Sequence, residues 1–168
     1  YTNYSFENIY VDSENETFCS IDGVLYSKDK KTLFTYPTKR TESSYVILSG
    51  VTTIGRCAFY GSSLSTVSFP DGLIKIEGSA FRYCSKLESV NLPNYSSSEG
   101  VLYNKDKSIL ITYPAGKDEI SFSIPLSVSA IEAYAFDFCE KLNSVIIHPN
   151  VEEIGWWAFM NSGLSSVT

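Results

Sequence analysis

The sequence contains little of what most catalytic and metal sites are built from. It has one histidine, His148, and one methionine, and its four cysteines form no Cys-x-x-Cys pair. A single histidine excludes zinc sites that need two or three imidazoles, and isolated cysteines exclude the usual zinc and redox motifs. We therefore expect no metal, no cofactor and no enzymatic activity, and we interpret His148 as a solvent-exposed turn residue beside Pro149.

Acidic residues near the N-terminal end do not complete a calcium loop either. Asp12, Glu14 and Glu16 alternate as the first ligands of such a loop do. However, Thr17 stands at the sixth position, where a glycine is needed, and Gly23 at the twelfth, where a glutamate is needed. We interpret the segment as an acidic, solvated loop.

Positive charge is also scarce. The chain has 13 Lys and Arg against 19 Asp and Glu, which gives a formal net charge of −6. Contacts with phosphates require clustered basic residues, so nucleic acid and anionic membrane surfaces are excluded as expected partners. No apolar run approaches the roughly 20 residues that span a bilayer, so we expect no membrane insertion within this segment.

What the sequence does contain is a repeat. Four segments keep an Ile, then Ala-Phe four residues later, then a Leu, and then a Val three residues beyond that Leu. They are VTTIGRCAFYGSSLSTVSFP from Val51, LIKIEGSAFRYCSKLESVNLP from Leu73, VSAIEAYAFDFCEKLNSVIIHP from Val128 and VEEIGWWAFMNSGLSSVT from Val151. The Phe residues recur after 22 and 23 positions, within the 20–29 residue period of leucine-rich repeats.

Each of these segments, here called a coil, predicts two extended pieces. Leu64, Val67 and Phe69 alternate with polar residues, as a strand with one buried face should, and Pro70 then turns the chain. The Ile-x-x-x-Ala-Phe part predicts a second short strand followed by a single helical or 3₁₀ turn. The small Ala allows coils to stack closely, and the Phe fills the core between them.

A larger repeat contains the smaller one. IDGVLYSKDKKTLFTYP from Ile21 matches SEGVLYNKDKSILITYP from Ser98, 77 residues later, and each predicts a β-hairpin around a Lys-Asp-Lys turn. We expect hairpin inserts at about 21–40 and 98–118, and coils at about 51–70, 73–93, 128–149 and 151–168. The predicted fold is a right-handed leucine-rich-repeat solenoid of the α/β horseshoe class, rich in β-structure, with short parallel strands. Residues 1–168 form one domain, and we interpret it as part of a longer array.

The coil pattern resembles the BspA-like leucine-rich repeat proteins, whose signature is Ile-Gly-x-x-Ala-Phe-x-x-Cys-x-x-Leu-x-x-Val-x-x-Pro. The Asp-Gly-Val-Leu-Tyr hairpin, present at 22–26, also occurs in that family, and Glu99 replaces the Asp in the second copy. The resemblance implies a cell-surface or secreted location. It also implies adhesion, because some such proteins bind host extracellular-matrix proteins.

The outward strand positions are the expected contact surface, since the parallel strands of a solenoid line one continuous face. Counted from the inward Leu and Val, they are Thr66, Ser68, Glu88, Ser89, Asn91, Ser144, Ile146 and Ser166. We predict a non-enzymatic module that binds a protein or glycan, with an adhesin as the narrower interpretation. The alternative is a structural spacer that holds another domain away from the cell. The mostly neutral composition of this face argues against charge-driven binding.

Two further features carry open alternatives. Cys84 and Cys139 occupy the same repeat position, three residues after the Phe, and we interpret them as buried thiols, with a disulfide as the less favoured interpretation. Trp156 and Trp157 stand at positions that vary between coils. They either pack against a following coil or form an exposed aromatic pair available to a partner.

Overall fold

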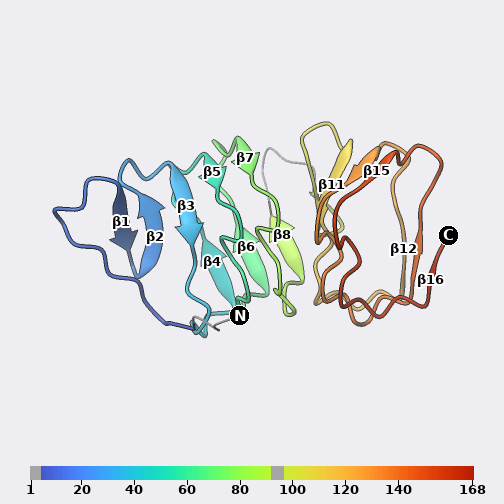
Figure 1. Cartoon of the computed structure of the whole chain (residues 1–168), viewed down its shortest axis with the longest axis horizontal. Helices are drawn as coiled ribbons and strands as arrows, with labels where there is room; N and C mark the ends of the chain where they lie inside the picture. Colours follow the sequence, from blue (N-terminus) through green and yellow to red (C-terminus); the bar gives the residue numbers. More distant parts are fainter. Residues whose placement is uncertain (1–4, 92–96) are drawn as a thin grey trace.

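The protein is an elongated stack of short strands, with β1 near one end and β16 near the other (Figure 1). The computed structural model describes residues 5–91 and 97–168, and within these ranges it contains sixteen strands and no helix. About six turns of a β-solenoid result, and the predicted solenoid with parallel strands is confirmed.

The strands form four sheets, two of which we call edge sheets and two face sheets. The first edge sheet, in spatial order, contains β1 (Phe18–Ile21), β2 (Val24–Ser27), β3 (Thr32–Thr35), β5 (Thr53–Ile54) and β7 (Lys75–Ile76). The second contains β15 (Glu153–Ile154), β13 (Ala130–Ile131), β11 (Ile109–Thr112), β10 (Val101–Tyr103) and β9 (Ser97–Ser98). The first face sheet contains β4 (Ser44–Val46), β6 (Thr66–Ser68) and β8 (Ser89–Asn91). The second face sheet contains β12 (Ser121–Ser123), β14 (Ser144–Ile146) and β16 (Ser166–Val167).

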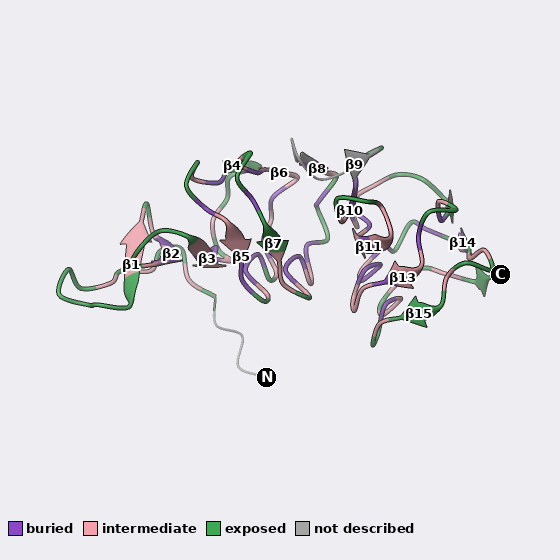
Figure 2. Ribbon diagram, turned by 90° about the horizontal axis from the view of Figure 1, so that it is seen from above, coloured by how far each residue is buried: buried purple, intermediate pink, exposed green. Residues whose placement is uncertain are grey.

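Parallel pairing places equivalent residues of successive coils side by side. Val67 pairs with Tyr45 on one side and with Val90 on the other, and Ile54 pairs with Ile76. Val67, Val90 and Ile54 are at most 1% exposed, and the buried parts of the chain lie inside the stack (Figure 2). The inward positions read from the period-2 pattern are therefore confirmed.

The Ala-Phe segments form tight turns, and the predicted helical turn, with the α/β horseshoe class that includes it, is wrong. Cys57 and Gly61 flank Ala58-Phe59 and have φ of 56° and 66°, in the left-handed region that a right-handed helix cannot contain. The Phe59 N–H therefore leaves its own coil and donates to the Ala80 carbonyl of the next coil at 2.8 Å. Neighbouring coils, rather than a helix, satisfy the backbone here.

An aromatic stack runs through the interior behind these turns. Phe59 lies 5.2 Å from Phe81 between ring centroids, and Phe136 lies 5.0 Å from Phe159. The hairpins continue the stack with tyrosine, because Tyr113 occupies the Phe position and lies 5.4 Å from Phe136. The predicted core position of the phenylalanines is confirmed, since Phe59, Phe81 and Phe136 are at most 6% exposed.

The two predicted hairpins pair β2 with β3 and β10 with β11 around the Lys-Asp-Lys segments, and each is preceded by a second tight turn. Asp22-Gly23 joins β1 to β2 and Glu99-Gly100 joins β9 to β10, with φ of 47° and 74° in the first turn and 55° and 80° in the second. Such turns need two residues with positive φ, which glycine adopts without steric cost. The Arg40 guanidinium donates to the Asp22 carbonyl. The Lys117 ammonium, 77 positions later, donates to the Glu99 carbonyl.

A buried polar group joins the two 77-residue units. Asp137, which is 6% exposed, accepts the Tyr83 N–H at 3.3 Å from the preceding unit and the Asn161 side-chain amide at 3.2 Å from the following coil. The Arg82 guanidinium lies 4.0 Å from the Tyr134 ring centroid across the same junction. Burial raises the pKa of the Asp137 carboxyl.

Candidate functional site

The face sheets bring most of the predicted contact residues into two rows each. In the first sheet Ser44, Thr66 and Ser89 form one row of directly paired residues, and Val46, Ser68 and Asn91 form the next. In the second sheet Ser121, Ser144 and Ser166 form one row, and Ser123 pairs with Ile146. Hydroxyl side chains therefore dominate both surfaces.

Apolar side chains interrupt these rows of hydroxyls. Val46 is 73% exposed and Ile146 is 52% exposed. Thr66, Ser68, Ser89 and Ser144 are half-buried between their neighbours, whereas Ser166 is exposed. An exposed apolar residue surrounded by small polar ones is a suitable anchor for a partner surface.

Two of the predicted site residues need separate comment. Glu88 lies one position before β8 and is exposed. Its backbone N–H donates to the Ser65 carbonyl, as the Ser65 N–H does to the Ser43 carbonyl. Glu88 therefore lies in a row with Ser65 and Ser43, one position before the face strands. The backbone of Asn91 pairs with Ser68, and its side chain lies outside the described residues.

Sequence reasoning missed the strands β4 and β12, which contribute Ser44, Val46, Ser121 and Ser123 to the rows. The signal was present, because Tyr45 precedes Ile54 by nine residues, as Val67 precedes Ile76. These strands follow the hairpins and lack the Leu that marks the other coils. Matching on that Leu therefore failed to find them.

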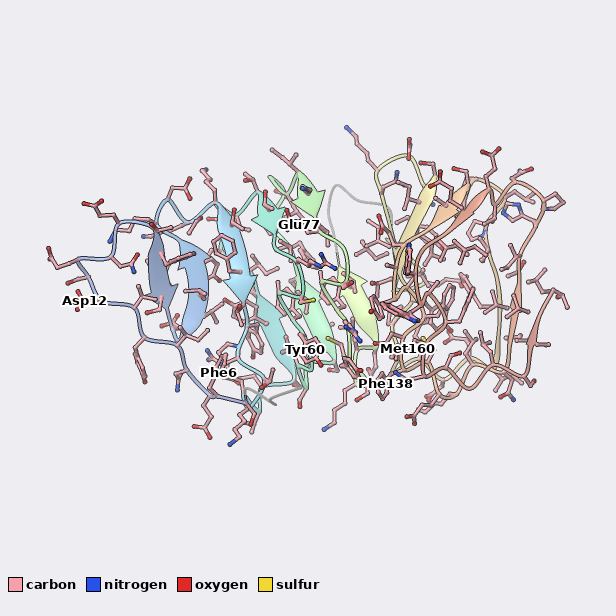
Figure 3. The ribbon with its side chains drawn as sticks, in the orientation of Figure 1. Phe6, Asp12, Tyr60, Glu77, Phe138 and Met160 are labelled. Carbon is pink, nitrogen blue, oxygen red and sulfur yellow. The ribbon has the colours of Figure 1, made fainter. Side chains whose placement is uncertain are left out.

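A run of aromatic rings, of which Tyr60 is exposed and the others are half-buried, forms a second feature of the surface. Tyr83 contacts Tyr60 at 5.0 Å and Phe138 at 4.7 Å between ring centroids, so three coils contribute to one run of rings. Figure 3 labels Tyr60 and Phe138, which lie on the same side of the stack. Arg82 sits 4.9 Å from the Tyr83 centroid, a distance at which cation–π attraction stabilises the contact.

Trp156 and Trp157 extend the exposed aromatic surface on the last coil. They are 79% and 59% exposed, and Trp157 contacts Tyr134 of the preceding coil at 5.6 Å. Both indoles are therefore exposed in residues 151–168, the last coil of this sequence, and their packing against a following coil stays an open alternative.

The cysteine thiols and possible metal ligands show no arrangement of a reactive site in the described residues. All four cysteines are free, and Cys84 and Cys139 are 2% and 1% exposed, which confirms the buried-thiol interpretation. Burial raises the pKa of Cys84 to about 12, so its thiol stays protonated and unreactive near neutral pH. Among the residues that the structure describes, no group of three or more His, Cys, Asp or Glu side chains could hold a metal ion.

The prediction of a solvent-exposed histidine is wrong. His148 is half-buried, and its Nε2 lies 2.6 Å from the Pro125 carbonyl of the preceding coil. Its Nδ1 accepts the Asn150 N–H at 3.2 Å. The ring therefore links two coils and has both nitrogens occupied.

The stacked coils, parallel face strands and repeated Ala-Phe turns define a leucine-rich-repeat solenoid. The family described as BspA type Leucine rich repeat region matches six copies over residues 31–116 and 115–168. The chain belongs to this family.

Solved structures agree with this assignment. A leucine rich cell surface protein from Faecalibacterium prausnitzii has a TM-score of 0.67 at 31% identity, covering 82% of this chain and 41% of that one. The pneumococcal vaccine antigen PcpA has a TM-score of 0.59 at 25% identity, covering 95% and 40%. A leucine-rich repeat protein from Eubacterium ventriosum shares the fold, with a TM-score of 0.53 at 17% identity, covering 88% and 68%. No curated protein matches the chain.

The chain spans about two fifths of the first two of these proteins. In the described part of this chain, no helix has the length and apolar character needed to cross a membrane.

Proposed function

We propose that the protein is a surface-exposed or secreted interaction module and that its face sheets contact a partner protein. The observation that carries this proposal is the pair of parallel sheets whose outward rows are hydroxyls interrupted by Val46 and Ile146. The extracellular location is supported by the Faecalibacterium relative, which is described as a cell surface protein. Adhesion to a host or matrix protein is the narrower form of the proposal.

The face sheets suit a broad, weakly polar contact. Short hydroxyl side chains lose little rotamer entropy when a partner covers them, and they donate and accept hydrogen bonds in either direction. Exposed Val46 and Ile146 supply the apolar contact that drives association. The site residues Thr66, Ser68, Glu88, Ser89, Asn91, Ser144, Ile146 and Ser166, with Val46 added, form the proposed surface.

The test is binding of the purified chain to immobilised fibronectin and fibrinogen by surface plasmon resonance. The first variant, Thr66→Arg with Ile146→Arg, places two long charged side chains on the face sheets. The matched control, Thr53→Arg with Ile154→Arg, makes the same changes on the edge sheets, where Ile154 is as exposed as Ile146, at 51% against 52%. We expect saturable binding that the face variant loses and the edge variant retains.

Equal loss in both variants would contradict a face-sheet site. Absence of saturable binding to either protein would instead favour the spacer, which needs no partner surface. Circular dichroism of each variant shows whether its fold is intact.

A further inference from the structure

A groove beside the N-terminal ends of β4, β6 and β8 is lined by several positively charged side chains, although the protein as a whole is acidic. The groove has a volume of about 540 Å³ and is bordered by segments from five successive turns of the solenoid. Four cations line it, namely Lys39, Arg40, Lys86 and Lys141, against one carboxylate, Glu88. The whole chain has a formal net charge of −6.

The four cations differ in whether they already form ion pairs or hydrogen bonds within the protein. Arg40 is held by Glu42 at 2.8 Å and by the hairpin carbonyl of Asp22, so its position is structural. Lys141 pairs with the exposed Asp118. Lys39 and Lys86 are exposed and, within residues 5–91 and 97–168, take part in no ion pair. These two ammonium groups are available to an anion.

The rest of the lining consists of hydroxyls. The six are Thr38, Thr41, Ser43, Ser63, Ser65 and Ser85. Among the described residues, only Ser65 uses its hydroxyl in a protein hydrogen bond, to the Ser43 carbonyl at 3.0 Å. The Thr38 Oγ1 is buried from solvent and has no partner. A ligand in the groove does not reach this hydroxyl, because it is closed to solvent; the exposed hydroxyls of Thr41, Ser43 and Ser85 are the ones open to a hydrogen bond.

We propose that this groove binds an anionic oligosaccharide, with sulfate or carboxylate groups placed against Lys39 and Lys86. The lining contains no aromatic or large apolar side chain, so it lacks the anchor pockets that peptide recognition uses. Paired hydroxyls and ammonium groups match a ligand that carries both alcohols and anions. The volume of the groove falls within the usual range for small-ligand sites, roughly 300–1,000 Å³.

This site is separate from the proposed face-sheet contact, with Glu88 at the margin of both. The two proposals predict different ligands, because the face rows are largely uncharged and the groove is basic. A variant that abolishes one interaction should therefore leave the other intact.

The experiment is a fluorescence-polarisation titration of the chain with a labelled heparin-derived hexasaccharide. Lys39→Glu with Lys86→Glu is compared with Lys31→Glu with Lys105→Glu, two exposed lysines outside the groove. Each replacement changes the charge by −2, so both variants go from −6 to −10. We expect at least about tenfold weaker binding in the groove variant and less than about threefold in the control, with affinity falling as salt is raised.

Equal weakening in the two variants would show that net charge alone governs binding, and it would overturn the groove site. Binding of uncharged maltohexaose as tight as that of the sulfated probe would overturn the role of the lysines. A hexaglutamate peptide binding as tightly as the hexasaccharide would overturn the saccharide class. Loss of fibronectin binding in the face variant with retention of hexasaccharide binding would support two separate sites.

Discussion

Replacement of Phe136 by alanine removes a ring from the centre of the second aromatic stack. The side chain is 0% exposed, and its ring lies between Tyr113 at 5.4 Å and Phe159 at 5.0 Å. The coils on either side are tied to this one by backbone hydrogen bonds. The stack therefore cannot collapse freely into the space that the ring leaves.

The magnitude follows from two contributions. Loss of buried apolar surface costs about 1.5–3 kcal/mol for a fully buried Phe. A cavity of roughly 80 Å³, if unrelaxed, adds about 2 kcal/mol at ~24 cal/mol per Å³. We expect a total of about 4 kcal/mol, within the ~3–5 kcal/mol measured for Phe→Ala in protein cores. Phe81→Ala should cost about 3 kcal/mol, because Phe81 retains 6% exposure.

The assay is reversible urea denaturation followed by far-ultraviolet circular dichroism and by tryptophan fluorescence. Coincidence of the two signals would establish a single transition. Thr66→Ala is the control, because this half-buried residue points outward from β6, and we expect a change below about 0.5 kcal/mol. A decrease of less than about 1 kcal/mol for Phe136→Ala would refute the claim that the stack carries the core.

The remaining predictions concern the contacts between coils. Gly155→Ala should lower the free energy of unfolding by about 1–3 kcal/mol, because the added Cβ would lie 2.3 Å from the Ala133 nitrogen. In the same urea denaturation, the control Gly50→Ala should change it little, because no atom lies within 4 Å of the added Cβ. The pKa of Asp137 is raised by burial, so the folded state binds this proton more tightly than the unfolded chain. The unfolding free energy of the wild type minus that of Asp137→Asn should therefore decrease as pH rises from about 4, and an increase would contradict the burial. Cys84 and Cys139 should resist Ellman's reagent in the native protein, and rapid modification of all four thiols would disprove their burial.

The sequence by itself determined the repeat, its inward positions and its family. Recurrence of Ile, Ala-Phe, Leu and Val at a period of 22 and 23 residues is visible without structure, because every coil must bury the same face against its neighbours. The same constraint identified Phe59, Phe81 and Phe136 as core residues. It also placed the row residues of β6, β8, β14 and β16, since outward positions alternate with inward ones along a strand, but it missed those of β4 and β12.

The conformation of the Ala-Phe turns could not be read in the same way. Positive φ occurs at bulky residues such as Tyr134 and Phe138, at 60° and 58°, where sequence rules expect glycine or asparagine. These residues accept the strained region because the backbone on both sides is fixed by hydrogen bonds to adjacent coils. Phe136 N–H, for example, donates to the Ala158 carbonyl at 2.7 Å. That constraint exists only once the coils have stacked, so local propensity favoured a helical turn that the structure does not contain.

Tertiary structure alone also decided where the charges lie. Lys39, Lys86 and Lys141 are distant in a sequence whose basic residues look scattered and outnumbered, and the sequence argued against charge-driven binding. Stacking brings them to one groove because equivalent positions of successive coils lie side by side on the same side of the solenoid. Local electrostatic potential depends on distance in space rather than along the chain, so an acidic solenoid can present a basic groove.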